Sequence, residues 1–178
     1  GALKNFAENF PQEVASHKSI QINEAQALDA ILTEAQRSLK IGLVRPDLPL
    51  ANSALLTGSA RSPSLHSQLK KELKSADQVD WLVSFIKWSG LRPILDDLRT
   101  FWETGNLDGS PLLRIATTSY MGATDVRAIE ALLDLPNTEL KVSYDTQRTR
   151  LHAKAYIFHR VTGFGSAYIG SANVSKAA

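Results

Sequence analysis

Hydrophobic positions along this chain follow helical and strand periods in turn. Apolar residues recur at helical spacing in residues 23–40, and Asn23 can cap the start of that helix. Spacing, caps or propensity predict further helices at residues 64–76, 91–103 and 124–135. Short apolar and β-branched runs indicate strands at residues 80–87, 112–119 and 139–144. Because strands alternate with helices, the pattern predicts an α/β fold.

This α/β fold is expected to be a mixed β-sheet flanked by helices on both faces, with an N-terminal helical extension. The run at residues 80–87 is almost continuously apolar, as in a strand covered on both faces. Residues 1–63 are expected to form an arm, a helix and a connecting segment packed on the domain. Residues 64–178 are expected to form the domain itself.

A β-hairpin is predicted at the end of the chain. Residues 151–158 and 166–173 are rich in aromatic and β-branched residues, and the link between them contains Gly163 and Gly165. Side chains alternate along a strand, so His152 and Lys154 point the same way, about 7 Å apart.

If this hairpin closes symmetrically about its turn, His152 faces Asn173 and Lys154 faces Ser171. Opposed positions have Cβ atoms about 5 Å apart, so the four polar groups would converge on one small patch. An imidazole can attack phosphorus, while ammonium, hydroxyl and carboxamide groups bind the non-bridging oxygens. The patch therefore predicts a phosphodiester site that needs neither a metal nor another cofactor.

The composition of the chain excludes several kinds of chemistry and of cellular location. The chain has no cysteine, which excludes disulfides, cysteine-ligated zinc and thiol catalysis. No apolar run reaches the length of a membrane span, and no signal peptide is recognisable, so we expect a cytoplasmic protein without membrane contact. The net charge of +2 is small, so a nucleic-acid surface would have to be local.

The H-x-K motif at residues 152–154 and the G-S-x-N motif at residues 170–173 resemble the phospholipase D-like superfamily. The resemblance implies that His152 is a nucleophile forming a phosphohistidine, and that Lys154, Ser171 and Asn173 bind the phosphate. No metal enters this chemistry. The superfamily's usual aspartate, five residues after the lysine, is His159 here, and we expect this change to affect hairpin structure more than chemistry.

Residues 81–178 also look like the phospholipase D-like nuclease domains attached to bacterial superfamily 2 helicases and restriction proteins. This resemblance implies DNA as the substrate and a helicase domain in the same polypeptide. It also implies that residues 64–178 are C-terminally truncated, since such families often orient the histidine with a downstream carboxylate. The superfamily's reaction uses two such histidines, and this chain has a single H-x-K motif. The resemblance therefore implies a homodimer with a composite site.

Two further features are candidates for substrate binding. Arg148 and Arg150 share the parity of His152 and Lys154, so the four would form a positive stripe if the strand begins early, and would otherwise be a solvated strand entry. Tyr120 lies just past the expected carboxyl end of a strand, where it could stack on a base. A rim tyrosine with a satisfied hydroxyl group is the simpler reading of that position.

Three functions remain open at this point. The first is a metal-independent nuclease acting on DNA, and the second is a non-catalytic phosphate-binding module that seats a helicase on DNA. A lipid phosphodiesterase is disfavoured because no basic amphipathic helix with a bulky apolar face is present.

Overall fold

The computed structural model describes residues 53–57, 59, 62–103, 112–145, 147 and 151–175. The predicted helix at residues 23–40 and most of the connecting segment lie outside these residues, so the boundary at residue 63 stays a prediction. Within the described residues, no helix is long and apolar enough to span a membrane.

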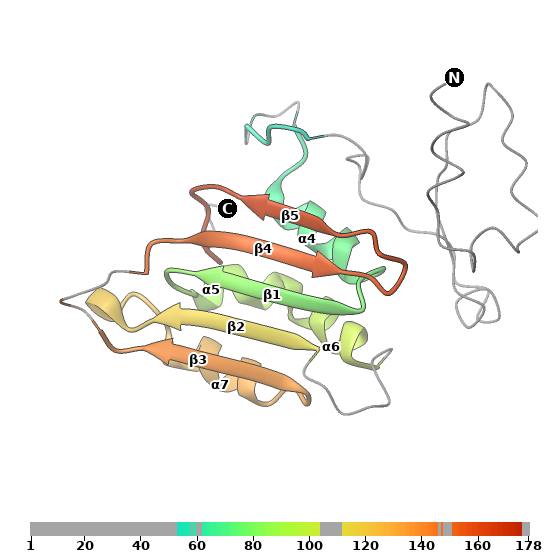
Figure 1. Cartoon of the computed structure of the whole chain (residues 1–178). Helices are drawn as coiled ribbons and strands as arrows, with labels where there is room; N and C mark the ends of the chain where they lie inside the picture. The colour runs from blue at the N-terminus through green and yellow to red at the C-terminus, as the bar shows by residue number, and fades with distance from the viewer. Residues whose placement is uncertain are drawn as a thin grey trace, which may run out of the picture. The chain divides into compact units, whose positions relative to one another are not determined.

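A five-stranded mixed sheet forms the centre of the described structure, in the order β3-β2-β1-β4-β5. Strands β1 (Gln78–Val83), β2 (Leu113–Thr118) and β3 (Thr138–Ser143) run parallel. Strand β4 (Lys154–His159) is antiparallel to β1, and β5 (Ser166–Ile169) is antiparallel to β4. The carboxyl ends of the three parallel strands therefore share one edge with the start of β4 (Figure 1).

Helices cover one face of this sheet in the described part of the chain (Figure 1). They are α4 (Leu65–Leu73), α5 (Trp88–Leu91), the 3-10 turn η1 (Arg92–Ile94), α6 (Leu95–Glu103) and α7 (Val126–Leu133). Ser64 caps α4 by accepting a hydrogen bond from the Ser67 backbone N–H, as its sequence favours. Helices on the second face stay a prediction.

Alternate residues of the central strands are buried under these helices. Val79, Trp81 and Val83 of β1 are buried, and Tyr156 and Phe158 of β4 pack on the same side of the sheet. The rings of Trp81 and Tyr156 meet edge to face, 5.7 Å apart. The α/β class with a mixed sheet is thus confirmed.

Two of the sequence predictions differ from the structure. The strand expected at residues 80–87 ends at Val83 and is buried on one face only, since Leu82 is 39% exposed. The helix expected at residues 91–103 begins three residues earlier and changes to a 3-10 turn around Pro93, whose ring nitrogen has no hydrogen to donate.

The hairpin register differs from the expected one by a single residue. Strand β4 pairs Tyr156 with Tyr168, and the Gly170 backbone N–H donates to the Lys154 carbonyl at 3.1 Å. Lys154 is therefore opposite Gly170, and the expected pairing with Ser171 is wrong. The strand also ends at Ile169, so the residues after it are placed by other contacts.

A buried ion pair joins the far end of this hairpin to α4. The Arg160 guanidinium pairs with the Glu72 carboxylate, and both side chains are almost completely buried. Glu72 also accepts a hydrogen bond from the Tyr168 hydroxyl at 2.7 Å, and Arg160 donates to Ser75 at 2.9 Å. The carboxylate is thus held by both a charge and a hydroxyl group.

Replacing Arg160→Ala should lower the free energy of unfolding by about 3–5 kcal/mol, because Glu72 would remain as an uncompensated buried charge. Urea unfolding followed by circular dichroism measures the change. The matched control is Arg99→Ala, which removes an exposed arginine paired with Asp96 and should change stability by about 0.5 kcal/mol or less. Equal losses in the two variants would contradict the role assigned to the buried pair.

Candidate active site

The polar residues predicted from the hairpin gather at the sheet edge where the parallel strands end. The last residue of β1, Val83, pairs with Lys154 at the start of β4. The next residue, Ser84, donates from its hydroxyl group to the Ala153 carbonyl at 3.3 Å. Residues 152–154 are therefore fixed against the end of β1.

Lys154 is a buried cation at this edge. Its residue is 6% exposed, and its Nζ donates to the His152 carbonyl oxygen at 2.9 Å. An ammonium group has three N–H donors. Within the described residues no carboxylate pairs with Lys154, so its charge has no counter-ion there. A buried charge without a partner is costly, and an anion bound beside it would remove that cost.

His152 precedes β4 rather than lying within it, and its side chain is exposed. The Lys154 contact reaches its backbone oxygen and leaves the imidazole ring out of the bond. The ring is thus accessible to a substrate that approaches the sheet edge.

Asn173 is buried and anchored by the backbone after β1. Its Oδ1 accepts the Phe85 backbone N–H at 3.2 Å, and Ile86 forms a parallel bridge with Val174. Because the oxygen faces a donor, the amide NH₂ group is left to donate elsewhere. Asn173 and Ala153 thus contact adjacent residues, Phe85 and Ser84, which brings the two motifs together.

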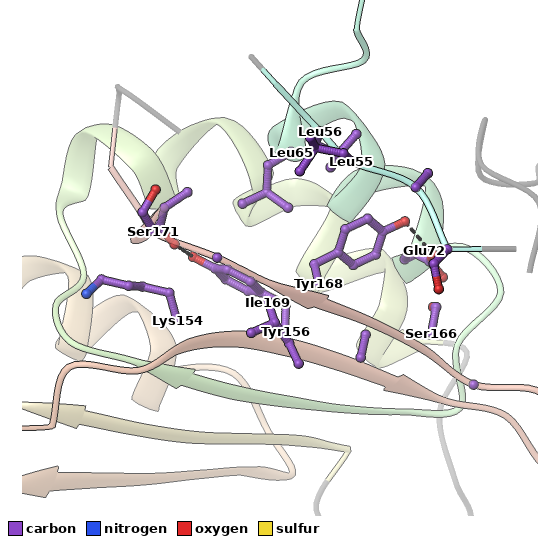
Figure 2. A pocket seen from close by; sticks show the side chains of 16 residues that line it. Leu55, Leu56, Leu65, Glu72, Lys154, Tyr156, Ser166, Tyr168, Ile169 and Ser171 are labelled. Atoms are coloured by element: carbon purple, nitrogen blue, oxygen red, sulfur yellow. Dashed lines mark hydrogen bonds between the residues drawn. The ribbon is translucent and has the colours of Figure 1, made fainter.

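Ser171 shares a cavity of about 650 Å³ with Lys154. The two lie at one end of this cavity, and Glu72 and Tyr168 lie at the other (Figure 2). The Tyr156 hydroxyl donates to the Ala172 carbonyl at 3.0 Å, which holds the chain between Ser171 and Asn173. Burial raises the pKa of this phenol, so it remains a donor at neutral pH.

His159 lies at the opposite end of β4, about 20 Å along the strand from His152. Its Nε2 is 2.9 Å from Asp80 Oδ2, and Arg114 donates two hydrogen bonds to the same carboxylate. Partial burial raises the pKa of Asp80, but the hydrogen bonds from Arg114 and His159 outweigh it and hold that pKa below its usual value. His159 is thus part of a surface ion cluster, away from the predicted site.

The structure describes only one of the three residues predicted to bind substrate beside the motifs. Arg148 and Arg150 lie outside the described residues, so the positive stripe stays a prediction. Tyr120 is half-buried in a 3-10 turn after β2, η2 (Tyr120–Gly122). The side chain that this turn exposes is Met121, which is 82% exposed and has a positive φ of 57°. No group of three His, Asp or Glu side chains suited to a metal occurs in the described ranges.

Sequence reasoning missed the linker of residues 84–88, which positions both motifs. Its apolar SFIK run looks like the continuation of a strand. One signal was available in Gly90, which lies in α5 directly under the chain after Asn173. A Cβ atom at Gly90 would lie 2.2 Å from the Ser175 backbone nitrogen, closer than any real contact. Only glycine therefore fits where α5 meets residues 174–175.

We expect Gly90→Ala to displace residues 173–175 and to lower the free energy of unfolding by about 1–3 kcal/mol, as overpacking does. The amide signals of Phe85 and Asn173 in a ¹H–¹⁵N spectrum should shift with it. Ser89→Ala, at the exposed neighbouring position, serves as the control and should leave both unchanged. Unchanged Asn173 signals in Gly90→Ala would show that α5 does not position this residue.

The part of the chain that contains the candidate site is similar to a known protein family. The family described as NgoFVII restriction endonuclease N-terminal PLD domain matches residues 115–178, which contain both motifs. No curated protein matched the chain. The match supports the resemblance seen in the sequence, because residues 115–178 are similar to the phospholipase D-like domain of a restriction endonuclease.

Proposed function

We propose that this chain is a metal-independent phosphodiesterase that cleaves DNA through a phosphohistidine intermediate. The observation that carries the proposal is the buried charge of Lys154, which has no carboxylate partner among the described residues and donates to the backbone carbonyl of the exposed His152. A site that already holds an unbalanced cation favours an anionic substrate, and a phosphodiester brings its negative charge to the adjacent nucleophile. The family match to a restriction endonuclease domain supports DNA as that substrate.

In the first step, a neutral nitrogen of the His152 ring attacks phosphorus. A phosphorus–nitrogen bond forms as the bond from phosphorus to one ester oxygen breaks, and that oxygen takes a proton from a general acid. Water then attacks phosphorus and gives a proton to the group that acted as the acid, the phosphorus–nitrogen bond breaks, and both the histidine and the acid are restored. No electrons are exchanged with a cofactor in either step.

Charge on the non-bridging oxygens increases as the nucleophile approaches. Lys154, Ser171 and Asn173 would donate to these oxygens. Lys154 and Ser171 line the same cavity, and the hydrogen bond from Phe85 turns the Asn173 NH₂ group into a free donor. The three donor groups are positioned before the substrate binds, so little reorganisation is required in the transition state.

A second histidine is needed as the general acid. His159 is too far along β4 to serve His152 of the same chain. We therefore propose that a second copy of the chain supplies its own His152 at a two-fold axis, giving a homodimer with a composite site. On this account, the domain works within a larger restriction or helicase protein.

The second candidate function is a non-catalytic module that binds DNA phosphates. The same Lys154 charge favours it, since a cation that attracts a phosphate does not by itself cleave it. The two functions differ in the need for the imidazole ring, which binding alone does not require.

The substitution His152→Ala should abolish DNA cleavage, because it removes the proposed nucleophile and no other histidine of residues 151–175 lies at this end of the sheet. The side chain is exposed, so the unfolding midpoint should stay within a degree or two of the parent's. Cleavage by the parent should continue in excess EDTA, measured by conversion of supercoiled plasmid. Full activity in His152→Ala, or complete loss of the parent's activity on chelation, would refute this mechanism.

The homodimer leads to a separate prediction. Sedimentation of the full chain should show a dimer at micromolar concentrations. Mixing inactive His152→Ala with the weakened Lys154→Ala should not restore the parent's activity, because each composite site needs both histidines. A species that remains monomeric while it cleaves DNA would contradict the composite site.

Lys154→Ala should lower turnover more than affinity, because a cation aimed at the scissile phosphate stabilises charge that develops in the transition state. We expect a fall in kcat of about 100-fold or more, with a change in KM of less than about tenfold. Single-turnover cleavage over a range of DNA concentrations separates the two. A rise in KM alone would favour the binding module.

A further inference from the structure

A stacked arginine lies beside the candidate site. The Arg127 guanidinium carbon is 4.0 Å from the centroid of the Trp88 ring, which is a cation–π contact. Stacking occupies the flat face of the guanidinium and leaves its N–H edges free to donate. Among the described residues, no carboxylate or carbonyl accepts from Arg127, and its side chain is exposed.

Asp125, two residues before Arg127, already accepts two hydrogen bonds. Asp125 accepts the Trp88 backbone N–H at 2.8 Å and the Lys87 ammonium at 3.1 Å. The hydrogen bond from Trp88, followed by that from Lys87, lowers the pKa of Asp125, so it stays charged at neutral pH. Lys87 and Asp125 balance each other, and the remaining positive charge is that of Arg127.

This cluster is tied to the same linker that holds Asn173. The Asp125 backbone N–H donates to the Ile86 carbonyl at 2.9 Å, one residue after Phe85. Trp88 is three positions after Phe85, which limits the distance between their backbones to about 11 Å. Phosphates of one duplex strand follow each other every 3.4 Å along the axis, so a backbone span of this length corresponds to at most about three nucleotides.

We propose that Arg127, held on Trp88, binds a backbone phosphate of the DNA a few nucleotides from the one that His152 attacks. The proposal rests on the DNA-cleaving function assigned above, and it adds an anchoring site to it. A planar guanidinium donates two parallel hydrogen bonds to a phosphate. Arg127 is the second residue of α7, so its positive charge lies near the positive end of the helix dipole, which is unfavourable. A phosphate bound there would offset this repulsion.

The test is the salt dependence of DNA binding by the full chain in the inactive His152→Ala background. Each neutralised phosphate contributes about 0.9 to the slope of log affinity against log salt for duplex DNA. Adding Arg127→Ala should reduce the steepness of that slope by about 0.9 for each subunit that contacts the probe. Adding Arg127→Lys should keep the slope, because the charge remains, and should weaken binding severalfold, because the planar fork is lost.

Arg99→Ala is the matched control, since it also removes one exposed positive charge but from α6. It should leave the slope unchanged. A parent slope retained in Arg127→Ala, with DNA still bound, would overturn the Arg127 site and leave the proposed function standing. A parent that binds no duplex DNA at low salt would overturn both proposals.

Discussion

The hydrogen bond from the Phe85 N–H to the Asn173 carboxamide is the contact on which the site depends. It joins the linker after the central strand to the last residue of the G-S-x-N motif. The neighbouring bridge between Ile86 and Val174 and the hydrogen bond from Lys87 N–H to the Val174 carbonyl extend this join by two residues. Without these contacts, residues 173–175 would have no backbone pairing with the rest of the sheet. Hairpin contacts thus hold Gly170 and Ala172, whereas Asn173 at the end of the motif is placed by contacts with the linker.

The same linker, residues 84–88, also positions the charged side chains around the candidate site. Ser84 holds the backbone before Lys154, and Trp88 presents Arg127 at the start of α7. Five successive residues therefore organise a buried cation, a carboxamide donor and an exposed guanidinium. The ion pairs elsewhere differ in kind, because Glu72 with Arg160 and Asp80 with Arg114 are already balanced. The buried charge of Lys154, which has no carboxylate partner in the described part of the chain, makes this edge a place for an anion.

Much of the fold followed from local patterns. The helix capped by Ser64, the strand after Leu112 and the hairpin could be predicted because periodicity and caps act within a few residues. The hairpin register could not, because it depends on how the loop between Arg160 and Gly165 closes and on where β5 ends. Symmetric closure put Lys154 opposite Ser171, whereas the chain leaves the strand after Ile169.

The candidate site could be proposed from the sequence as a set of residue types, but its geometry could not. The H-x-K and G-S-x-N motifs predict the phosphate chemistry, and the family match supports the nuclease class. The anchoring of Asn173 by Phe85 had no sequence signal, since a backbone N–H is present at nearly every position. Gly90 carried a weak signal, and Arg127 carried none until its ring partner was known.

The central claim is that His152 becomes covalently bonded to phosphorus during cleavage. Acid-labile, base-stable labelling of the protein by ³²P-labelled DNA, followed by peptide mapping, tests this most directly. The account predicts one labelled peptide that contains His152, with the label lost in His152→Ala. Cleavage of the same DNA with no label at any time after mixing, or with label on another residue, would contradict it.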